Sequence, residues 1–231
     1  MFEAIQGIDV SHWQDGIDFD QVEREGYIFA IAKATDGTGD PDPGFGRHLQ
    51  AIRDAGLVAG AYHFARPSSV GTPADAEAEA MEFARRITEA GGLGPVSLPP
   101  AIDFEEYSDN GPAENGPWLS AFVHVVELEL GTSPMIYTGR NVWRYEAGHS
   151  DAFDHLPLWL VRYDRGTPSL ELEGFGQADL WQWSGGGRFA YGPKVAGRVV
   201  DINRFVGPDW TDLTTPRIRP PWCEVTDPII W

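Results

Sequence analysis

The chain has few cysteines, few basic side chains and no long apolar run, and each of these absences excludes a class of proteins. Its single cysteine, Cys223, allows no internal disulfide and no cysteine-based zinc site. It carries 17 basic against 35 acidic side chains, a formal net charge of −18 at pH 7. This deficit of positive charge argues against nucleic acid and against an anionic membrane as partners. No apolar run reaches the roughly 18 residues that a membrane-spanning helix needs, so we expect none.

Three kinds of motif are also missing. The first seven residues lack the basic start and the long apolar run of a secretory signal peptide, so we expect no export signal there. No glycine-rich phosphate-binding motif follows a predicted strand. The acidic residues discussed below have no histidine partners at metal-ligand spacing. We therefore predict neither a cofactor nor a metal.

Predicted strands and helices alternate along most of the chain. Apolar runs of strand length recur at intervals of roughly 25 to 40 residues, which is the pattern of a parallel α/β sheet. The predicted strands are residues 4–10, 27–35, 57–64, 99–105, 134–138, 157–161, 180–183 and 198–205. The predicted helices are residues 19–25 after the cap Asp18, and three that begin near Phe45, Thr72 and Asn115 and end at Gly56, Gly91 and Gly131.

The last third of the chain departs from this alternation. No helix is predicted between residues 161 and 180, and the last two predicted strands can form a hairpin with residues 184–197 as a glycine-rich loop. We predict an α/β fold, a modified (β/α) TIM-like barrel with an irregular, helix-poor last third. The barrel is predicted to span residues 1–207. Residues 208–231, which contain several prolines and three tryptophans, are predicted to be a C-terminal extension.

The stretch Leu98–Glu106 carries the strongest chemical signal. Asp103 and Glu105 lie two residues apart at the end of a predicted buried strand. Alternate residues of a strand share one face, which places the two Cα atoms about 6.7 Å apart. Two carboxyl groups this close push one pKa up, and we expect Asp103 to raise the pKa of Glu105. A protonated acid beside an ionised one is the arrangement that glycoside hydrolysis requires, although acidic pairs also end ordinary strands.

Other polar side chains end the predicted strands and would meet at the carboxyl-terminal rim of a parallel barrel. With the acidic pair, they are Asp9, Lys33, Tyr62, Asp103, Glu105, Tyr137, Arg162, Gln182 and Asp201. Each has a structural alternative as well: Asp9 or Asp201 in a turn, Lys33 in an ion pair, the tyrosines in the core. Four carboxyl groups from three strands nevertheless favour one shared acidic site.

The sequence neighbours of these residues are expected to face the other way. His63 follows Tyr62 and Glu106 follows Glu105, so strand alternation predicts that His63 packs behind the barrel and that Glu106 points out of the cleft. Aromatic residues also gather at the predicted strand ends, namely Trp13, Phe64, Tyr137, Trp159, Trp181 and Trp183. They either fill the barrel or stack on sugar rings, which lie flat on aromatic side chains. Acids surrounded by aromatics favour a polysaccharide over a phosphate or a nucleotide.

The strand motifs, taken in order, resemble those of glycoside hydrolase family 25, the Chalaropsis-type lysozymes of bacteria, fungi and phage endolysins. The first four are Gly7-Ile-Asp-Val-Ser-His-Trp-Gln14, Ala32-Lys-Ala-Thr35, Gly60-Ala-Tyr-His-Phe-Ala65 and Leu98-Pro-Pro-Ala-Ile-Asp-Phe-Glu105. The series continues with Ile136-Tyr-Thr138, Pro157-Leu-Trp-Leu160, Leu180-Trp-Gln-Trp183 and Val200-Asp-Ile-Asn203. Each motif is short, but their order over residues 5–206 is specific. The family fold, a modified β/α barrel with an irregular second half, agrees with the pattern above.

The resemblance implies four catalytic acids and a set of lining residues. The acids are Glu105, as the general acid, with Asp9, Asp103 and Asp201. The substrate-binding residues are Lys33, Tyr62 and Tyr137, to which their position at strand ends adds Trp159, Gln182 and Trp183. The implied reaction is hydrolysis of the β-1,4 bond from N-acetylmuramic acid to N-acetylglucosamine in peptidoglycan. Asp36 stands where the family often has Glu, a departure confined to one contact of the cleft wall.

Two alternatives stay open at this point. One is a catalytically inactive barrel that only binds cell-wall glycan, against which the retention of all four acids argues. The other is a chitinase-like N-acetylglucosaminidase, but the residues before Asp103 lack the first two acids of the chitinase pattern D-x-x-D-x-D-x-E. The expected partner is peptidoglycan, with a protein partner or a linker at residues 208–231. We expect action at the bacterial cell wall after delivery by phage lysis, a virion or non-classical export.

Overall fold

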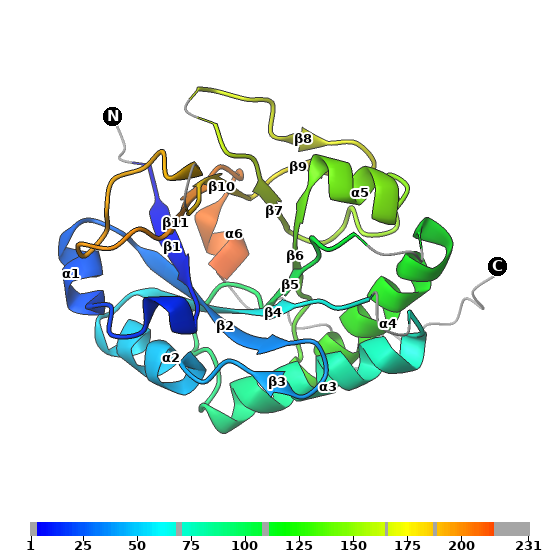
Figure 1. Ribbon diagram of the computed structural model, residues 1–231, viewed down its shortest axis with the longest axis horizontal. Helices are drawn as coiled ribbons and strands as arrows, with labels where there is room; N and C mark the ends of the chain where they lie inside the picture. The colour runs from blue at the N-terminus through cyan, green and yellow to red at the C-terminus, as the bar shows by residue number, and fades with distance from the viewer. Residues whose placement is uncertain (1–3, 68–70, 108–110, 165, 187–188, 215–231) are drawn as a thin grey trace.

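The computed structural model describes residues 4–67, 71–107, 111–164, 166–186 and 189–214. Within them, strands close into a barrel in the order β1, β11, β10, β7, β6, β5, β4 and β2, and β2 pairs back to β1 (Figure 1). Their bounds are β1 Gln6–Val10, β2 Phe29–Asp36, β4 Val58–Phe64, β5 Ala101–Asp103, β6 Met135–Gly139, β7 Leu158–Val161, β10 Leu180–Ser184 and β11 Asp201–Phe205. The predicted TIM-like barrel is confirmed.

Strand direction decides which side chains meet at each end of the barrel. Neighbouring barrel strands are parallel except where β11 takes part, because β11 runs antiparallel to both β1 and β10. The predicted hairpin of the last two strands is therefore confirmed. The amino end of β11 lies beside the carboxyl ends of the other strands, and Asp201 pairs in register with Asp9.

Several strands are shorter than predicted, and β5 is shortened the most. Residues 99–105 were expected to form a strand, but β5 contains only Ala101–Asp103. Pro99 and Pro100 have no backbone N–H for a ladder, which delays the start. The backbone N–H of Phe104 still donates to the Tyr137 carbonyl at 2.9 Å, and Glu105 lies beyond this last contact.

Helices cover most of the outside of the barrel. They are α1 Phe19–Arg24, α2 Phe45–Asp54, α3 Pro73–Glu89, α4 Pro112–Leu130 and α5 Arg140–Glu146. The Asp18 carboxylate caps α1 by accepting the Gln21 N–H at 3.0 Å, as predicted. Helix α4 begins at Pro112 rather than Asn115, since a proline at the first helical position needs no N–H. Helix α5 was not predicted, because seven residues are too few for a clear period.

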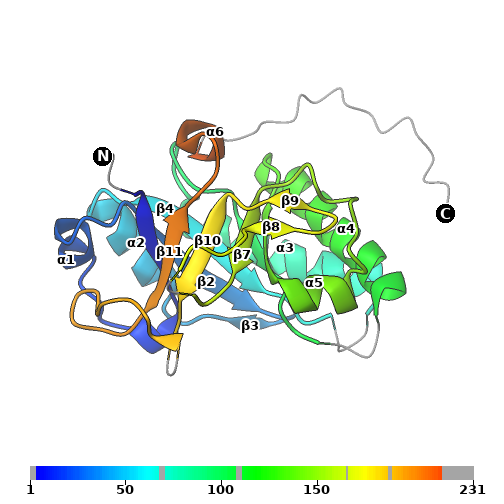
Figure 2. The same ribbon diagram turned by 90° about the horizontal axis from the view of Figure 1, so that it is seen from above.

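In the described part of the chain, no α-helix covers the side of the barrel formed by β10 and β11 (Figure 2). Between β7 and β10 the described residues form only the short strands β8 (Glu171–Leu172) and β9 (Gly176–Gln177), so the helix-poor last third is confirmed. Strand β2 also pairs with the short β3 (Asp40–Pro41) beyond the barrel. Among the described residues no helix combines the length and the apolar character that crossing a membrane requires.

The barrel interior is closed at its amino-terminal end by α6 (Trp210–Thr214). Leu213 is 3% exposed and belongs to the apolar cluster inside the barrel. The Trp210 ring lies 5.5 Å from that of Phe29 and 5.3 Å from that of Phe205. The first residues of the predicted extension thus pack on the barrel floor, and residues 215–231 lie outside the described part of the chain.

We expect Leu213→Ala to lower the free energy of unfolding by about 2 kcal/mol or more, because it removes buried apolar contacts at the barrel floor. Urea denaturation followed by fluorescence measures this difference. Leu128→Ala is the matched control: Leu128 is 68% exposed on α4, and its removal should change the free energy by less than about 0.5 kcal/mol. Equal losses in the two variants would show that α6 contributes no packing.

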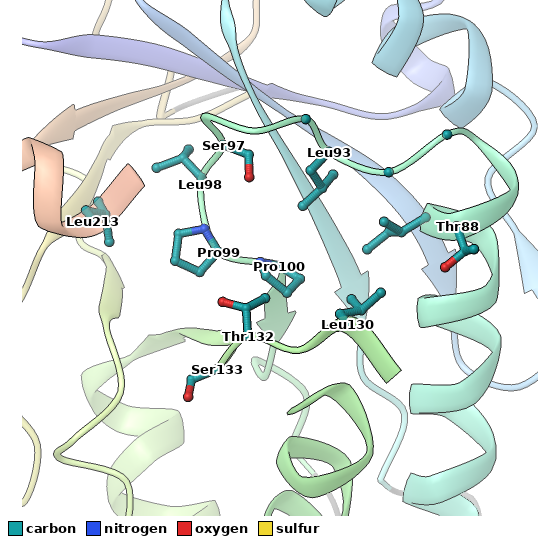
Figure 3. Close-up of a pocket in the computed structure, with 14 residues that line it drawn as sticks. Thr88, Leu93, Ser97, Leu98, Pro99, Pro100, Leu130, Thr132, Ser133 and Leu213 are labelled. Atoms are coloured by element: carbon teal, nitrogen blue, oxygen red, sulfur yellow. The ribbon is translucent and has the colours of Figure 1, made fainter. Parts of the chain in front are cut away.

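A hollow of about 520 Å³ lies beside this floor, before the start of β5 (Figure 3). Its walls come from the ends of α3 and α4, from α6 and from the segment Ser97–Pro100. None of the described residues that line it is titratable. This cavity therefore offers no acid or base for catalysis, in contrast to the opposite end of the barrel.

Candidate active site

The predicted site residues gather in a cleft of about 270 Å³ at the carboxyl-terminal end of the barrel. The cleft is lined by Asp9, Val10, Ser11, Trp13, Gln14, Lys33, Tyr62, Phe64, Asp103, Glu105, Tyr137, Trp159, Tyr163, Gln182 and Asp201. All four predicted acids are among them. Of the predicted substrate-binding residues, only Trp183 is absent.

Strand ends bring the four acids together. Asp103 is the last residue of β5, and Glu105 follows it beyond the strand. Asp9 lies near the end of β1, and Asp201 begins β11. Because β11 runs against the other strands, its first residue rather than its last enters the cleft.

Trp183 is a correction to the sequence-based assignment. It alternates with Gln182 on β10, and since Gln182 faces the cleft, Trp183 faces outward. The Arg204 guanidinium lies over its ring at 5.8 Å and over that of Trp181 at 5.7 Å. Arg162, another predicted strand-end residue, is not a lining residue either; its carbonyl accepts the indole N–H of Trp181 at 2.7 Å.

Ion pairs build one wall of the cleft. A bulge in β2 between Lys33 and Thr35 breaks the register with β4, and the Lys33 ammonium donates to the Asp36 carboxylate at 2.6 Å. Arg66 donates to the same carboxylate at 2.6 Å and also to Glu106. Asp36 thus holds Lys33 despite being shorter than Glu. Glu106 points away from the cleft lining, as predicted, and is paired with Arg66.

His63 lies behind the barrel, as strand alternation predicts. It is fully buried, its Nε2 is 2.6 Å from a Glu79 carboxylate oxygen, and its Nδ1 is 2.8 Å from the Thr35 hydroxyl. Its ring stacks on Phe122 with centroids 5.0 Å apart. These contacts fasten β4 to the covering helices α3 and α4 and give His63 no access to the cleft.

Burial raises the pKa of every acid in the cleft, and repulsion between carboxylates adds to the rise at Asp103, Glu105 and Asp201. Burial raises the pKa of Asp9 to about 6 and, with the charges of Asp9 and Glu105, that of Asp201 to about 8. Burial, followed by the charge of Glu105, raises the pKa of Asp103 well above its usual value. The cleft can therefore hold protonated and ionised carboxyl groups side by side near neutral pH.

The pKa of Glu105 is also raised, but not for the reason expected from the sequence. Burial is the largest cause, and the charge of Asp9 comes before that of Glu106 among the carboxylates that add to it. The charge of Glu105 in turn raises the pKa of Asp103, which is buried. The charge of Asp9 therefore favours a protonated Glu105.

An amide network beneath Asp9 includes two residues that sequence analysis missed. The Asp9 carboxylate accepts N–H groups from Gln182 at 2.9 Å and from Asn203 at 2.8 Å. The hydroxyls of Tyr137 and Tyr163 donate to the Gln182 carbonyl at 2.9 and 3.0 Å. Asn203 follows Asp201 by two residues, so strand alternation could have found it. Tyr163 lies past the end of β7, where no periodicity marks it.

An acid-lined cleft at the carboxyl-terminal end of a TIM-like barrel is an arrangement of glycoside hydrolases. Comparison of the whole sequence shows which family of glycoside hydrolases this is. The chain belongs to glycosyl hydrolases family 25, whose family model matches residues 8–191.

Individual relatives agree with this family. Lysozyme M1 of Streptomyces globisporus is 33% identical over 215 residues, which cover 88% of this chain and 68% of that protein. The N,O-diacetylmuramidase of Chalaropsis sp is 30% identical over 201 residues, which cover 82% and 91%. The crystal structure of the lysozyme from Streptomyces coelicolor matches with a TM-score of 0.76 and 28% identity, covering 93% of this chain and 97% of that one. The predicted family, fold and enzyme class are confirmed.

Proposed function

We propose that the protein hydrolyses the β-1,4 bond from N-acetylmuramic acid to N-acetylglucosamine in peptidoglycan, with Glu105 as the general acid. The observation that carries this proposal is the meeting of four carboxyl groups with raised pKa in one cleft. The printed names of the relatives, lysozyme and N,O-diacetylmuramidase, support the choice of substrate.

The chemistry needs two carboxyl groups in different protonation states. Glu105, protonated, gives its proton to the glycosidic oxygen as the bond to the sugar breaks. Positive charge then develops on the sugar ring, and an ionised carboxylate stabilises it. Asp9 suits this second role, because two amide N–H groups support its negative charge.

Asp103 has an open contact for the substrate. Its Oδ1 is buried and has no hydrogen-bond partner among the described residues. A buried oxygen left in this state costs free energy unless a ligand completes it. We place the 2-acetamido group of the substrate beside Asp103, where its N–H can donate to this oxygen.

Mass spectrometry of the products from a defined peptidoglycan digest tests the function. We expect fragments with N-acetylmuramic acid at the reducing end. Reducing-end N-acetylglucosamine would instead support the chitinase-like alternative. Binding to the glycan without any product would support the inactive barrel.

Trp13 is placed to bind a sugar at the rim of the cleft. It is 79% exposed, in a 3-10 helix, His12–Gln14, that the Ser11 side chain caps. The neighbouring His12 is fixed by the Asp42 carboxylate at 2.9 Å. An exposed indole on a capped helical turn offers a stacking face, and its ring has few rotatable bonds to order on binding.

We therefore expect Trp13→Ala to raise KM for polymeric glycan several-fold, equivalent to about 1 kcal/mol, with kcat nearly unchanged. Steady-state kinetics on solubilised peptidoglycan measure both constants. Tyr145→Ala is the control, since Tyr145 is 56% exposed but does not line the cleft. A fall in kcat at constant KM would argue that Trp13 acts on the reaction rather than on binding.

The proposed substrate implies action at the bacterial cell wall. A net charge of −18 gives the chain no attraction to the anionic polymers of such a wall. We propose that the predicted extension, residues 208–231, first covers the floor of the barrel with α6 and then leads to a protein partner or a linker.

A further inference from the structure

Asn203 occupies an unusual place between the barrel interior and the acidic cleft. It is fully buried, and its neighbour Trp159 is 2% exposed. The Asn203 amide N–H donates to Asp9 at 2.8 Å, while its carbonyl accepts the indole N–H of Trp159 at 2.8 Å. The three side chains come from β11, β1 and β7, so the contact joins strands that are far apart in the sequence.

The indole decides which way the Asn203 amide points. An indole N–H can only donate, so the group that faces it must be the Asn203 carbonyl. The NH₂ end of Asn203 is then directed at Asp9 whether or not Asp9 carries a proton. Gln182 is less constrained, because the tyrosine hydroxyls that meet its carbonyl can also accept a hydrogen bond.

We propose that Asn203, oriented by Trp159, is a positioning residue that presents a fixed N–H to Asp9 and keeps this buried carboxyl ionised in the working cleft. The catalytic role of Asn203 rests on the function proposed above, whereas its hydrogen bond to Asp9 does not. Burial raises the pKa of Asp9 to about 6, and the hydrogen bond from Asn203 is the largest influence that opposes this rise. A charge-assisted hydrogen bond to a buried carboxylate is among the stronger ones in proteins.

Several titratable groups face Asp9 across the cleft and contribute to its charge state. They are Lys33, Tyr62, Asp103, Glu105, Tyr137, Tyr163 and Asp201. Replacing Asn203 leaves all of them in place. A change in the titration of Asp9 in such a variant would therefore report the lost N–H.

The test follows the Asp9 carboxyl directly, without substrate. Protein labelled with ¹³C-aspartate is titrated by NMR, and the Asp9 signal is identified by its loss in Asp9→Asn. We expect Asn203→Leu, which has a similar size and no N–H, to raise the Asp9 pKa by about one unit or more. Trp159→Phe, which removes the indole N–H together with part of the ring, should shift it by less in the same direction. If Asn203→Leu does not fold, Trp159→Phe carries the test.

Asn115→Leu is the matched control. Asn115 is also fully buried and donates to a carboxylate, Glu146, at 3.0 Å, but it lies on α4 outside the cleft. This variant should leave the Asp9 titration unchanged even if it lowers stability. A pH profile of turnover gives a second readout: since Asp9 works ionised, its raised pKa in Asn203→Leu should move the acidic limb to higher pH, with kcat recovering above it.

The outcomes separate this proposal from the proposed function. An Asp9 titration that is the same in Asn203→Leu, Trp159→Phe and the wild type would overturn the positioning role. So would an equal shift in Asn115→Leu. A specific shift in a protein that releases no muramic acid reducing ends would support the role of Asn203 and reject the muramidase assignment.

Discussion

Glu105→Gln should lower turnover on peptidoglycan by at least about 100-fold, the size of effect typical of a lost general acid. Gln keeps the size and the hydrogen bonding of Glu but has no proton to give to the leaving oxygen. Glu105 has no structural ion pair among the described contacts, so we expect little change in thermal stability. Release of soluble muropeptides from purified cell walls, measured against total protein that remains folded, checks both statements.

Glu106→Gln is the control for this result. The Glu106 side chain is paired with Arg66 and does not line the cleft, so its turnover should stay within a few-fold of the wild type. Loss of activity in Glu106→Gln together with normal activity in Glu105→Gln would mean that the proton donor has been assigned to the wrong face of the chain.

Asp9→Asn should have the next largest effect, a strong loss of turnover together with a displaced pH profile. Glu105 works protonated, so activity disappears as the pH rises through its pKa. The charge of Asp9 raises that pKa. Removing the charge lowers it, and the basic limb of the profile should move to lower pH. Rates measured across the pH range on a soluble glycan fragment show both changes.

Asp54→Asn serves as its control, because Asp54 ends α2 at the surface and does not line the cleft. It should leave rate and profile unchanged. A basic limb that moves to higher pH in Asp9→Asn, or stays in place, would contradict the assigned coupling between Asp9 and Glu105.

Local spacing predicted much of this site because strand geometry repeats. Two-residue alternation placed Asp103 and Glu105 in one cleft and turned His63 and Glu106 away from it. The same alternation should have excluded Trp183, which was assigned by its nearness to a strand end rather than by its face. The same alternation could also have predicted Asn203 as a site residue, since it shares a face with Asp201.

Other features depend on contacts that no spacing encodes. The direction of β11 determines that Asp201 enters the cleft from the start of its strand. The burial of Asp103 and Glu105, which raises the pKa of both, comes from the segments packed around them. Tyr163 reaches Gln182 from a segment without secondary structure. These facts arise from the packing of distant segments and required the structure.

Ion pairs stabilise one wall of the cleft and buried hydrogen bonds stabilise the other, so the two walls should respond differently to salt. On one side Lys33 and Arg66 are joined through Asp36, and Arg66, at 40% exposed, also holds Glu106. Dissolved ions weaken such partly exposed ion pairs. On the other side the amides of Gln182 and Asn203 form buried contacts beside Asp9, which ions barely reach. Rising ionic strength should therefore weaken substrate binding on the side of Lys33. The geometry of Asp9, held by the two amides, should stay the same.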